Sequence, residues 1–264
     1  MSSEGVISRH TNSLCRRIEE TVMEYKEIEI YGYRTLEFYL DGRRAVLICP
    51  KVPREDKKWL FKTEYLEAFP GFDIEMLERG YYVAYIKNST RWCKPEDTDA
   101  KARLADFLIK EFGLYEKCLP VGLSCGGMQA VYFAAKYPQY VSVMYIDAPV
   151  LNLLSCPCAL GMATCNMYEE YFNDTGITIS ELLNFREHPI DMVDGMIESG
   201  IAVALVCGDR DVVVPYEENG KILAEKYRKS GLPFFEVVKE DCNHHPHGLK
   251  DNSDLISFVE KHYV

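Results

Sequence analysis

The sequence has few of the features that direct a protein to a membrane or to a nucleic acid. It contains no basic run longer than two residues, and no apolar run of about 18 residues that would suit a membrane-spanning helix. The 41 Asp and Glu residues outnumber the 30 Lys and Arg residues, which gives a net charge of −11. Because such a chain repels phosphates, we expect neither a nucleic acid nor a membrane as a partner.

The start of the chain lacks the apolar segment of a secretory signal peptide. The ten cysteines are therefore expected to be reduced thiols of a cytoplasmic protein. Cys156, Cys158 and Cys165 invite a zinc interpretation, but the C-x-C spacing is tighter than structural zinc sites use and no fourth ligand is evident. The sequence predicts no metal site and no cofactor.

The composition is that of a globular chain, because 47% of the 264 residues are hydrophobic and 27% are charged. Alternating and continuous apolar runs indicate strands, and Asp41-Gly42 is typical of a two-residue hairpin turn. We expect strands at 27–30, 35–38, 45–48, 59–61, 82–86, 118–121, 141–146, 201–207 and 234–238, and helices at 12–24, 64–79, 97–112, 124–137, 216–229 and 253–262.

This order predicts an α/β fold in which an antiparallel start leads into a mainly parallel sheet with helices on both faces. The segment 150–195 interrupts the alternation of strands and helices. It is too long for an ordinary loop, so we expect a small cap insertion there. No linker composition marks a second unit. The prediction is one domain over 1–264, with an N-terminal helical extension over about 1–24.

Gly122-Leu123-Ser124-Cys125-Gly126 matches the pattern G-x-S-x-G. A short apolar strand precedes it, and an apolar helix that begins with small residues follows it. A strand, a tight turn and a helix in this order expose a serine hydroxyl as a nucleophile. The alternative is a plain turn whose serine caps the helix.

With these features the chain resembles the α/β-hydrolase fold family over about residues 25–264. In that family the acid follows the seventh strand in a G-x-x-D pattern, and Asp211 matches it in Gly208-Asp209-Arg210-Asp211. Asp209 is expected to cap the turn. Asp147 is the rival, because some members place the acid after the sixth strand; otherwise we expect it to line the site or brace its loop.

The resemblance places the general base in Asn243-His244-His245-Pro246-His247, where His244 fits best. The order Ser124, Asp211, His244 is the α/β-hydrolase order. His245 or His247 as the base stays open, and both are candidates for substrate binding. The three histidines could instead bind a metal, but adjacent side chains of an extended segment point apart, which disfavours it.

An oxyanion hole needs N–H donors aimed at the developing charge. The resemblance implies the N–H of Cys125 and a second N–H after the third strand of the family, near Lys62 or Thr63. The familiar His-Gly pair of that loop is absent here. Lys62 and Glu64 are candidates for contact with a polar substrate, and Trp92 and Tyr168 for lining the pocket.

The prediction is a cofactor-independent serine hydrolase that cleaves a carboxylic ester through an acyl-enzyme. Its partner would be a small-molecule ester, with a small acyl group on a polar or sugar-like alcohol preferred. A peptidase or acyltransferase of the same fold, and a catalytically silent binding protein on this fold, stay open. Homo-oligomer formation also stays open.

Overall fold

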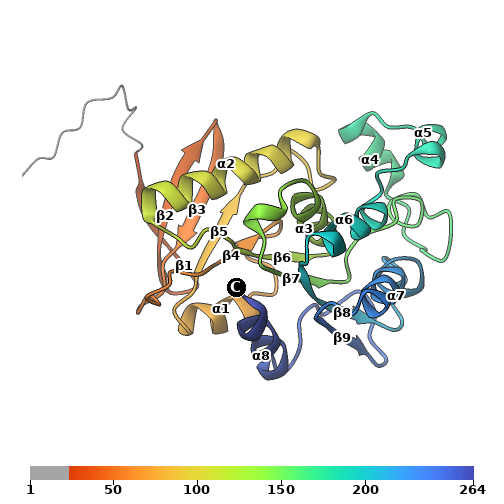
Figure 1. Ribbon diagram of the computed structural model, residues 1–264. Coiled ribbons are helices and arrows are strands. Elements are labelled where there is room, and N and C mark those ends of the chain that lie inside the picture. The colour runs from red at the N-terminus through yellow and green to blue at the C-terminus, as the bar shows by residue number, and fades with distance from the viewer. Residues whose placement is uncertain (1–23) are drawn as a thin grey trace, which may run out of the picture.

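The computed structural model describes residues 24–264, so the helix expected at 12–24 falls outside the described part of the chain except at its last residue. The described residues form a nine-stranded sheet with the order β1-β2-β3-β5-β4-β6-β7-β8-β9 (Figure 1). The strands are β1 Lys26–Ile30, β2 Tyr33–Leu40, β3 Arg43–Ile48, β4 Trp59–Lys62, β5 Tyr82–Ile86, β6 Leu119–Leu123, β7 Val143–Asp147, β8 Ala202–Gly208 and β9 Phe234–Lys239.

The sheet is antiparallel at one edge and parallel elsewhere. The pairs β1–β2, β2–β3 and β3–β5 are antiparallel, and the pairs from β5 through β4 and β6 to β9 are parallel. Asp41 and Gly42 turn the chain between β2 and β3 with φ of 51° and 75°, and positive angles at both positions are what this hairpin turn requires. The predicted fold class is confirmed.

Helices cover both faces of the sheet: α1 and α8 lie on one face, and α2, α3, α6 and α7 lie on the other (Figure 1). The helices are α1 Gly71–Glu78, α2 Pro95–Phe112, α3 Cys125–Lys136, α4 Tyr168–Thr175, α5 Ile179–Asn184, α6 Val193–Glu198, α7 Gly220–Ser230 and α8 Ser253–His262. Among the helices of residues 24–264, none has the length and apolar character needed to cross a bilayer.

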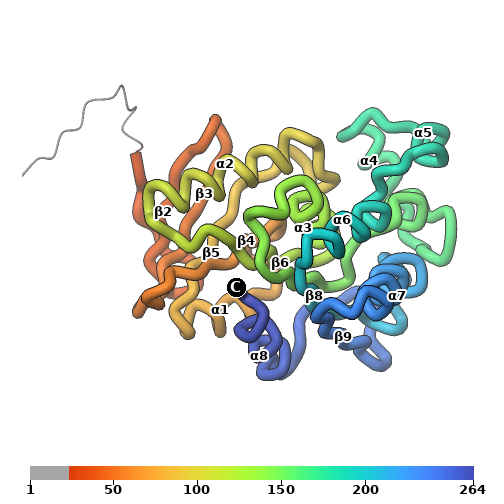
Figure 2. The backbone as a smooth tube through the Cα atoms, viewed as in Figure 1, coloured from red at the N-terminus to blue at the C-terminus, as the bar shows by residue number. Residues whose placement is uncertain are grey.

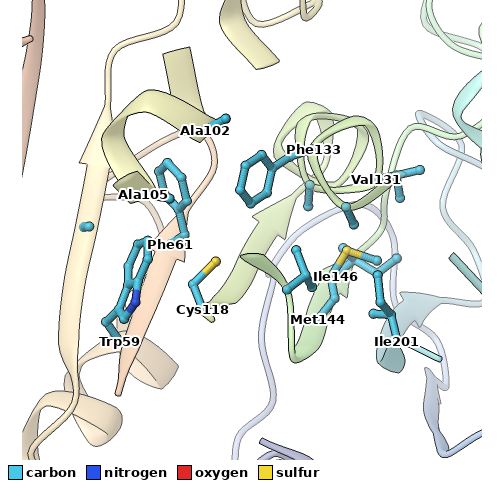
Figure 3. Packing of buried hydrophobic residues seen from close by; sticks show 14 of the residues in the cluster. Trp59, Phe61, Ala102, Ala105, Cys118, Val131, Phe133, Met144, Ile146 and Ile201 are labelled. Atoms are coloured by element: carbon cyan, nitrogen blue, oxygen red, sulfur yellow. The ribbon is translucent and has the colours of Figure 1, made fainter. Parts of the chain in front are cut away.

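The central strands are buried on both faces, which explains their continuous apolar sequences. In β7, Met144 and Ile146 belong to the core beneath α2 and α3, whereas Val143 and Tyr145 belong to the core beneath α1 and α8. Figure 3 shows the first of these cores, in which Phe133 of α3 lies near Phe61 of β4. This packing fixes the strand ends from which the loops of the site emerge.

The helix expected at 64–79 is wrong over its first half, because the structure has a loop up to Pro70 and α1 only from Gly71. Proline disfavours a helical conformation at the residue before it. Phe69, which precedes Pro70, has φ 48°, and Tyr65 has φ 52°. The loop thereby turns the side chains of Tyr65 and Phe69 toward the carboxyl ends of the parallel strands, where they line a cavity.

Between β7 and β8 the chain leaves the sheet and forms α4 and α5 at one end of the molecule (Figure 2). Several polar contacts attach this segment to the rest, among them the following two. The Arg91 guanidinium pairs with the Glu170 carboxylate of α4, with Nε to Oε1 at 2.6 Å. The Thr164 N–H donates to Val212 O at 2.8 Å. The segment predicted as a cap thus contacts the loop that follows β8.

Candidate active site

Ser124 lies at the sharp turn between β6 and α3 with φ 54° and ψ −120°. A non-glycine residue in such a region costs on the order of 1–3 kcal/mol, and such strain is concentrated at functional sites. The turn needs its glycines: a Cβ on Gly122 would lie 2.2 Å from Gly126 O, and one on Gly127 would lie 2.4 Å from Pro149 Cβ. The Ser124 N–H donates to Asp147 O at 2.8 Å and thereby ties the turn to β7.

Loops after β8 and β9 bring Asp211 and His244 to this serine. The Ser124 hydroxyl donates to His244 Nε2 at 3.0 Å, and His244 Nδ1–H donates to Asp211 Oδ2 at 2.7 Å. Asp211 Oδ1 accepts the N–H groups of Val213 and Val214, each at 2.8 Å. Both carboxylate oxygens of the buried Asp211 are therefore occupied by donors, which holds the carboxylate in one orientation.

The two loops are also joined to each other. The Arg210 N–H donates to Cys242 O at 2.9 Å, and the Asp209 carboxylate accepts the Cys242 N–H at 3.1 Å. Asp209 therefore braces the loop after β9 instead of facing Ser124. A Cβ on Gly208 would lie 2.3 Å from Cys242 O, so the glycine that opens G-x-x-D permits this close approach of the two loops.

Asp147, the rival acid, contacts a different histidine. His247 Nδ1–H donates to Asp147 Oδ1 at 2.6 Å, and the Gly248 N–H donates to Asp147 Oδ2 at 2.8 Å. Both members of this second imidazole–carboxylate pair are buried. Asp147 does not reach His244 by any hydrogen bond among residues 24–264, and it does not line the cavity at Ser124. Asp147 therefore braces the loop after β9, which was the other role expected for it.

The predictions of Thr63 as an oxyanion donor and of Lys62 as a contact to a polar substrate both need correction. The Thr63 N–H donates to Val121 O at 3.1 Å, because Thr63 continues the pairing of β4 with β6. It cannot also serve an oxyanion. Lys62 is buried within β4, and its ammonium pairs with the Asp73 carboxylate at 2.6 Å, away from Ser124. The Cys125 N–H, at the first turn of α3, has no backbone acceptor in the part of the chain that the structure describes.

Glu64 is also held away from substrate. Its Oε2 accepts the Asn88 side-chain amide at 2.6 Å, and the same amide donates to Thr63 O at 2.8 Å. Asn88 in turn accepts from the fully buried Lys101, whose ammonium also donates to Gln129 Oε1 at 2.7 Å. Glu64 therefore belongs to a buried polar network that fixes the end of β4, and it does not line the cavity at Ser124.

A cavity of about 350 Å³ opens at Ser124, a size suited to a small ligand. Ser124, Cys125 and His244 form part of its wall, together with the two candidates His245 and His247. The sequence did not point to the other side chains of the wall, which include Tyr65, Phe69, Arg91, Met167 and Val213. Tyr65 and Phe69 fall within the helix expected at 64–79, and no sequence pattern marks Arg91 as a residue of the site.

The two side chains suggested as pocket-lining residues lie elsewhere. Trp92 is buried and lines a separate cavity of about 620 Å³ between α2, α3 and α4. Tyr168 does not line the cavity at Ser124; its hydroxyl accepts the Ile179 N–H at 3.1 Å and joins α4 to α5.

Burial governs the protonation of two groups beside Ser124. It raises the pKa of the Cys125 thiol to about 11. It also raises the pKa of the Tyr65 hydroxyl far above its usual value, while the Arg91 guanidinium opposes the shift in part. Both groups keep their protons at neutral pH, so Cys125 is not a nucleophile and Tyr65 is a hydrogen-bond donor.

This pKa predicts that Cys125 resists alkylation. At pH 8 a thiol with a pKa of about 11 is ionised in about one molecule in a thousand, and the thiolate is the reactive form. Iodoacetamide at pH 8 should modify the partly exposed Cys242 and leave Cys125 unmodified, as peptide mass spectrometry can measure. Modification of Cys125 should rise with pH toward 11. Equal rates at Cys125 and Cys242 at pH 8 would contradict the assignment.

No protein-family model matches the sequence, and no curated protein matches it. Solved structures do match the fold. A puromycin-hydrolysing peptidase of Mycobacterium tuberculosis superposes with a TM-score of 0.67 at 13% identity, over 91% of this chain and 39% of that one. The acylaminoacyl peptidase of Pyrococcus horikoshii gives a TM-score of 0.63 at 13% identity, over 91% of this chain and 42% of that one.

Acetyl xylan esterase 1 from Thermoanaerobacterium sp. JW/SL YS485 gives a TM-score of 0.61 at 17% identity, over 93% of this chain and 89% of that one. The chain thus spans less than half the length of the two peptidases and most of the length of the esterase. At these identities the likeness concerns the fold. Together with the strand order, it confirms the α/β-hydrolase fold that the motif order indicates.

Proposed function

We propose that the chain is a serine hydrolase that cleaves a carboxylic ester through an acyl-enzyme. The observation that carries this proposal is the continuous hydrogen-bond chain from the Ser124 hydroxyl through His244 to the buried Asp211, on a strained turn at the wall of a cavity. Serine, imidazole and carboxylate in this arrangement are the parts of a nucleophilic triad. The structural likeness to an esterase and to peptidases of this fold adds support.

In the first step Ser124 Oγ attacks the ester carbonyl, and its proton passes to His244 Nε2. Asp211 stabilises the imidazolium through the bond at Nδ1. The carbon–oxygen bond to the alcohol then breaks, and the alcohol leaves with the proton from His244. In the second step a water molecule gives a proton to His244 and attacks the acyl carbon, which releases the carboxylic acid and restores the Ser124 hydroxyl.

The developing oxyanion needs donors in the same cavity. The Cys125 N–H is the first, because it follows the nucleophile at the start of α3. We assign the second to the Tyr65 hydroxyl in place of Lys62 and Thr63. Tyr65 lines the cavity with Ser124 and Cys125, and burial keeps its hydroxyl protonated.

Tyr65→Phe tests this assignment, since it removes the hydroxyl and keeps the ring. Loss of one oxyanion donor costs about 10²–10³ in kcat, and we expect a decrease of that size with little change in KM. Tyr168→Phe is the matched control, because that hydroxyl bonds within the cap segment at Ile179. Steady-state kinetics on a p-nitrophenyl ester give both values. If Tyr65→Phe is as active as the control, the Tyr65 hydroxyl is not a donor of the oxyanion hole.

For the substrate, a small acyl ester of a polar or sugar-like alcohol is the preferred class. The cavity of about 350 Å³ is at the small end of ligand sites. The esterase is also the compared structure whose length this chain nearly spans. A peptidase is the second candidate, favoured by the likeness to two peptidases.

A screen of p-nitrophenyl esters against aminoacyl arylamides separates these candidates. The proposal predicts a higher kcat/KM on acetyl and other short acyl esters than on any arylamide. Preference for an arylamide would make the protein a peptidase. Failure of every substrate, together with no reaction with a fluorophosphonate, would favour a silent binding protein.

The compartment we propose is the cytoplasm, with reduced thiols. The nine cysteines within residues 24–264 are free, and Cys118, Cys156 and Cys207 are buried among apolar side chains. There they act as small hydrophobic residues.

A further inference from the structure

Three histidines meet at the wall of the cavity beside Ser124. One ring nitrogen from each of His244, His245 and His247 lies within 4.8 Å of the others, and the ring centroids are 4.8–4.9 Å apart. The argument that adjacent side chains point apart therefore fails here. It holds for extended backbone, whereas this segment bends at His244, Pro246 and Gly248.

The hydrogen bonds show which ring nitrogens are already committed to a partner. Nδ1 of His244 and Nδ1 of His247 are both committed to carboxylates, Asp211 and Asp147. Nε2 therefore carries the free lone pair in each ring. Among residues 24–264, His244 Nε2 accepts only the Ser124 hydroxyl, and neither ring nitrogen of the exposed His245 has a hydrogen-bond partner.

The cluster shares one feature with histidines that bind a metal. A metal-bound histidine almost always donates its other ring N–H to a carboxylate or a carbonyl, which fixes the tautomer and raises the basicity of the ligating nitrogen. Here two of the three rings have such a carboxylate, and both carboxylates are buried. The Asp147 and Asp211 carboxylates lie on the far side of their rings from Nε2, and the Lys239 ammonium lies 3.9 Å from Asp147 Oδ2.

We propose that His244, His245 and His247 form a binding site for a divalent transition metal, best matched by Zn²⁺, and that metal binding inhibits the hydrolase. Imidazole ligands suit Zn²⁺, and three protein ligands leave a fourth position for water or substrate. Tetrahedral Zn–N bonds of about 2.0–2.1 Å place the nitrogens about 3.3 Å apart. The cluster must therefore contract by about 1 Å or more from 4.8 Å.

His245 is the ring that can supply this movement. It is exposed, and its one ring contact outside the histidine cluster, among residues 24–264, is stacking on Phe69 at a centroid distance of 5.5 Å. His244 and His247 are held at Nδ1 by their carboxylates, so they supply less of the movement. The loop between them is fixed by Lys239, whose ammonium donates to Pro246 O at 2.6 Å and to Gly248 O at 3.2 Å.

Inhibition follows from the lone pair at His244 Nε2. The proposed mechanism uses it to accept the Ser124 proton, and a bound metal would occupy it. This consequence rests on the proposed function, whereas metal binding does not. The site is thus different from a catalytic zinc, and a chelator should leave the activity of the metal-free enzyme unchanged.

Titration of the metal-free full chain with Zn²⁺ by calorimetry, under a non-chelating reductant, tests binding without turnover. We expect one Zn²⁺ per chain. His245→Ala and His247→Ala should each weaken binding more than about tenfold, and Asp147→Asn by about 10–100-fold. His262→Ala on α8 is the matched control and should bind as the wild type does. Circular dichroism establishes that each variant is folded.

Co²⁺ as a probe distinguishes the histidine site from the cysteines. The proposal predicts visible d–d bands of a tetrahedral nitrogen site, without the intense near-ultraviolet band of cobalt bound to thiolate. If the enzyme is active, Zn²⁺ should lower the rate of ester hydrolysis by the wild type. The same Zn²⁺ concentration should leave the rate of His247→Ala equal to the rate of that variant without metal. No binding, affinity unchanged in folded His245→Ala and His247→Ala, or a thiolate band would overturn the proposal.

Discussion

Ser124→Ala should lose essentially all hydrolytic activity while keeping its fold. Loss of the nucleophile of a serine triad lowers kcat by about 10⁶. Serine and alanine both carry a Cβ, so the strained φ of 54° is the same in both, and only the hydroxyl that donates to His244 is lost. Kinetics on a p-nitrophenyl ester and a thermal melt measure the two effects.

Ser257→Ala is the matched control for this variant, because Ser257 is an exposed serine of α8 whose hydroxyl bonds only within its helix. It should keep wild-type activity. A Ser124→Ala protein that retains more than about a tenth of wild-type activity would show that another group is the nucleophile.

The second large effect distinguishes the two carboxylates. Asp211→Asn should lower kcat by about 10⁴, because an amide at this place favours the wrong tautomer of His244 and does not stabilise its imidazolium. Asp147→Asn should cost less than about a hundredfold, since Asp147 orients His247 and Gly248 and takes no part in the proton transfer.

These two variants are each other's control, because each replaces a buried carboxylate that binds an imidazole at the same edge of the sheet. The ratio of their kcat values is the measurement. If Asp147→Asn is the more severe, His247 with Asp147 is the base and acid of the reaction, and the bond between His244 and Ser124 is incidental.

The sequence predicted the parts of the site whose position follows from strand order. Ser124, Asp211 and His244 each follow a parallel strand, and parallel strands end at one edge of a sheet, so strand order predicts that they lie at the same edge. Asp147 and His247 also follow parallel strands, and only the resemblance to the α/β-hydrolase family favoured Asp211 and His244 over them. The G-x-S-x-G and G-x-x-D patterns carried further information, because Gly122, Gly127 and Gly208 stand where a Cβ would meet neighbouring atoms.

The loop after β4 could not be predicted in the same way. Whether the Thr63 N–H is free depends on how far β4 continues its pairing with β6, and the local sequence does not encode that extent. The apolar spacing of 64–79 resembles a helix, but Pro70 and the positive φ of Phe69 delay α1 to Gly71. The contribution of Tyr65 to the cavity was missed for this reason.

The histidine loop shows a third case. Three histidines within four residues were visible in the sequence, yet their shared orientation depends on the bends of the loop and on the distant Asp147. Sequence spacing described an extended segment, whereas tertiary contacts hold the rings at centroid distances of 4.8–4.9 Å.

The central claim is that Ser124 is an activated nucleophile, and covalent labelling tests it most directly. The full chain is treated with a fluorophosphonate at neutral pH and digested, and the modified peptide is sequenced by mass spectrometry. The account predicts one adduct per chain, located on Ser124, and its loss in Ser124→Ala and in Asp211→Asn over the same time. No adduct, or an adduct on a different residue, would contradict it.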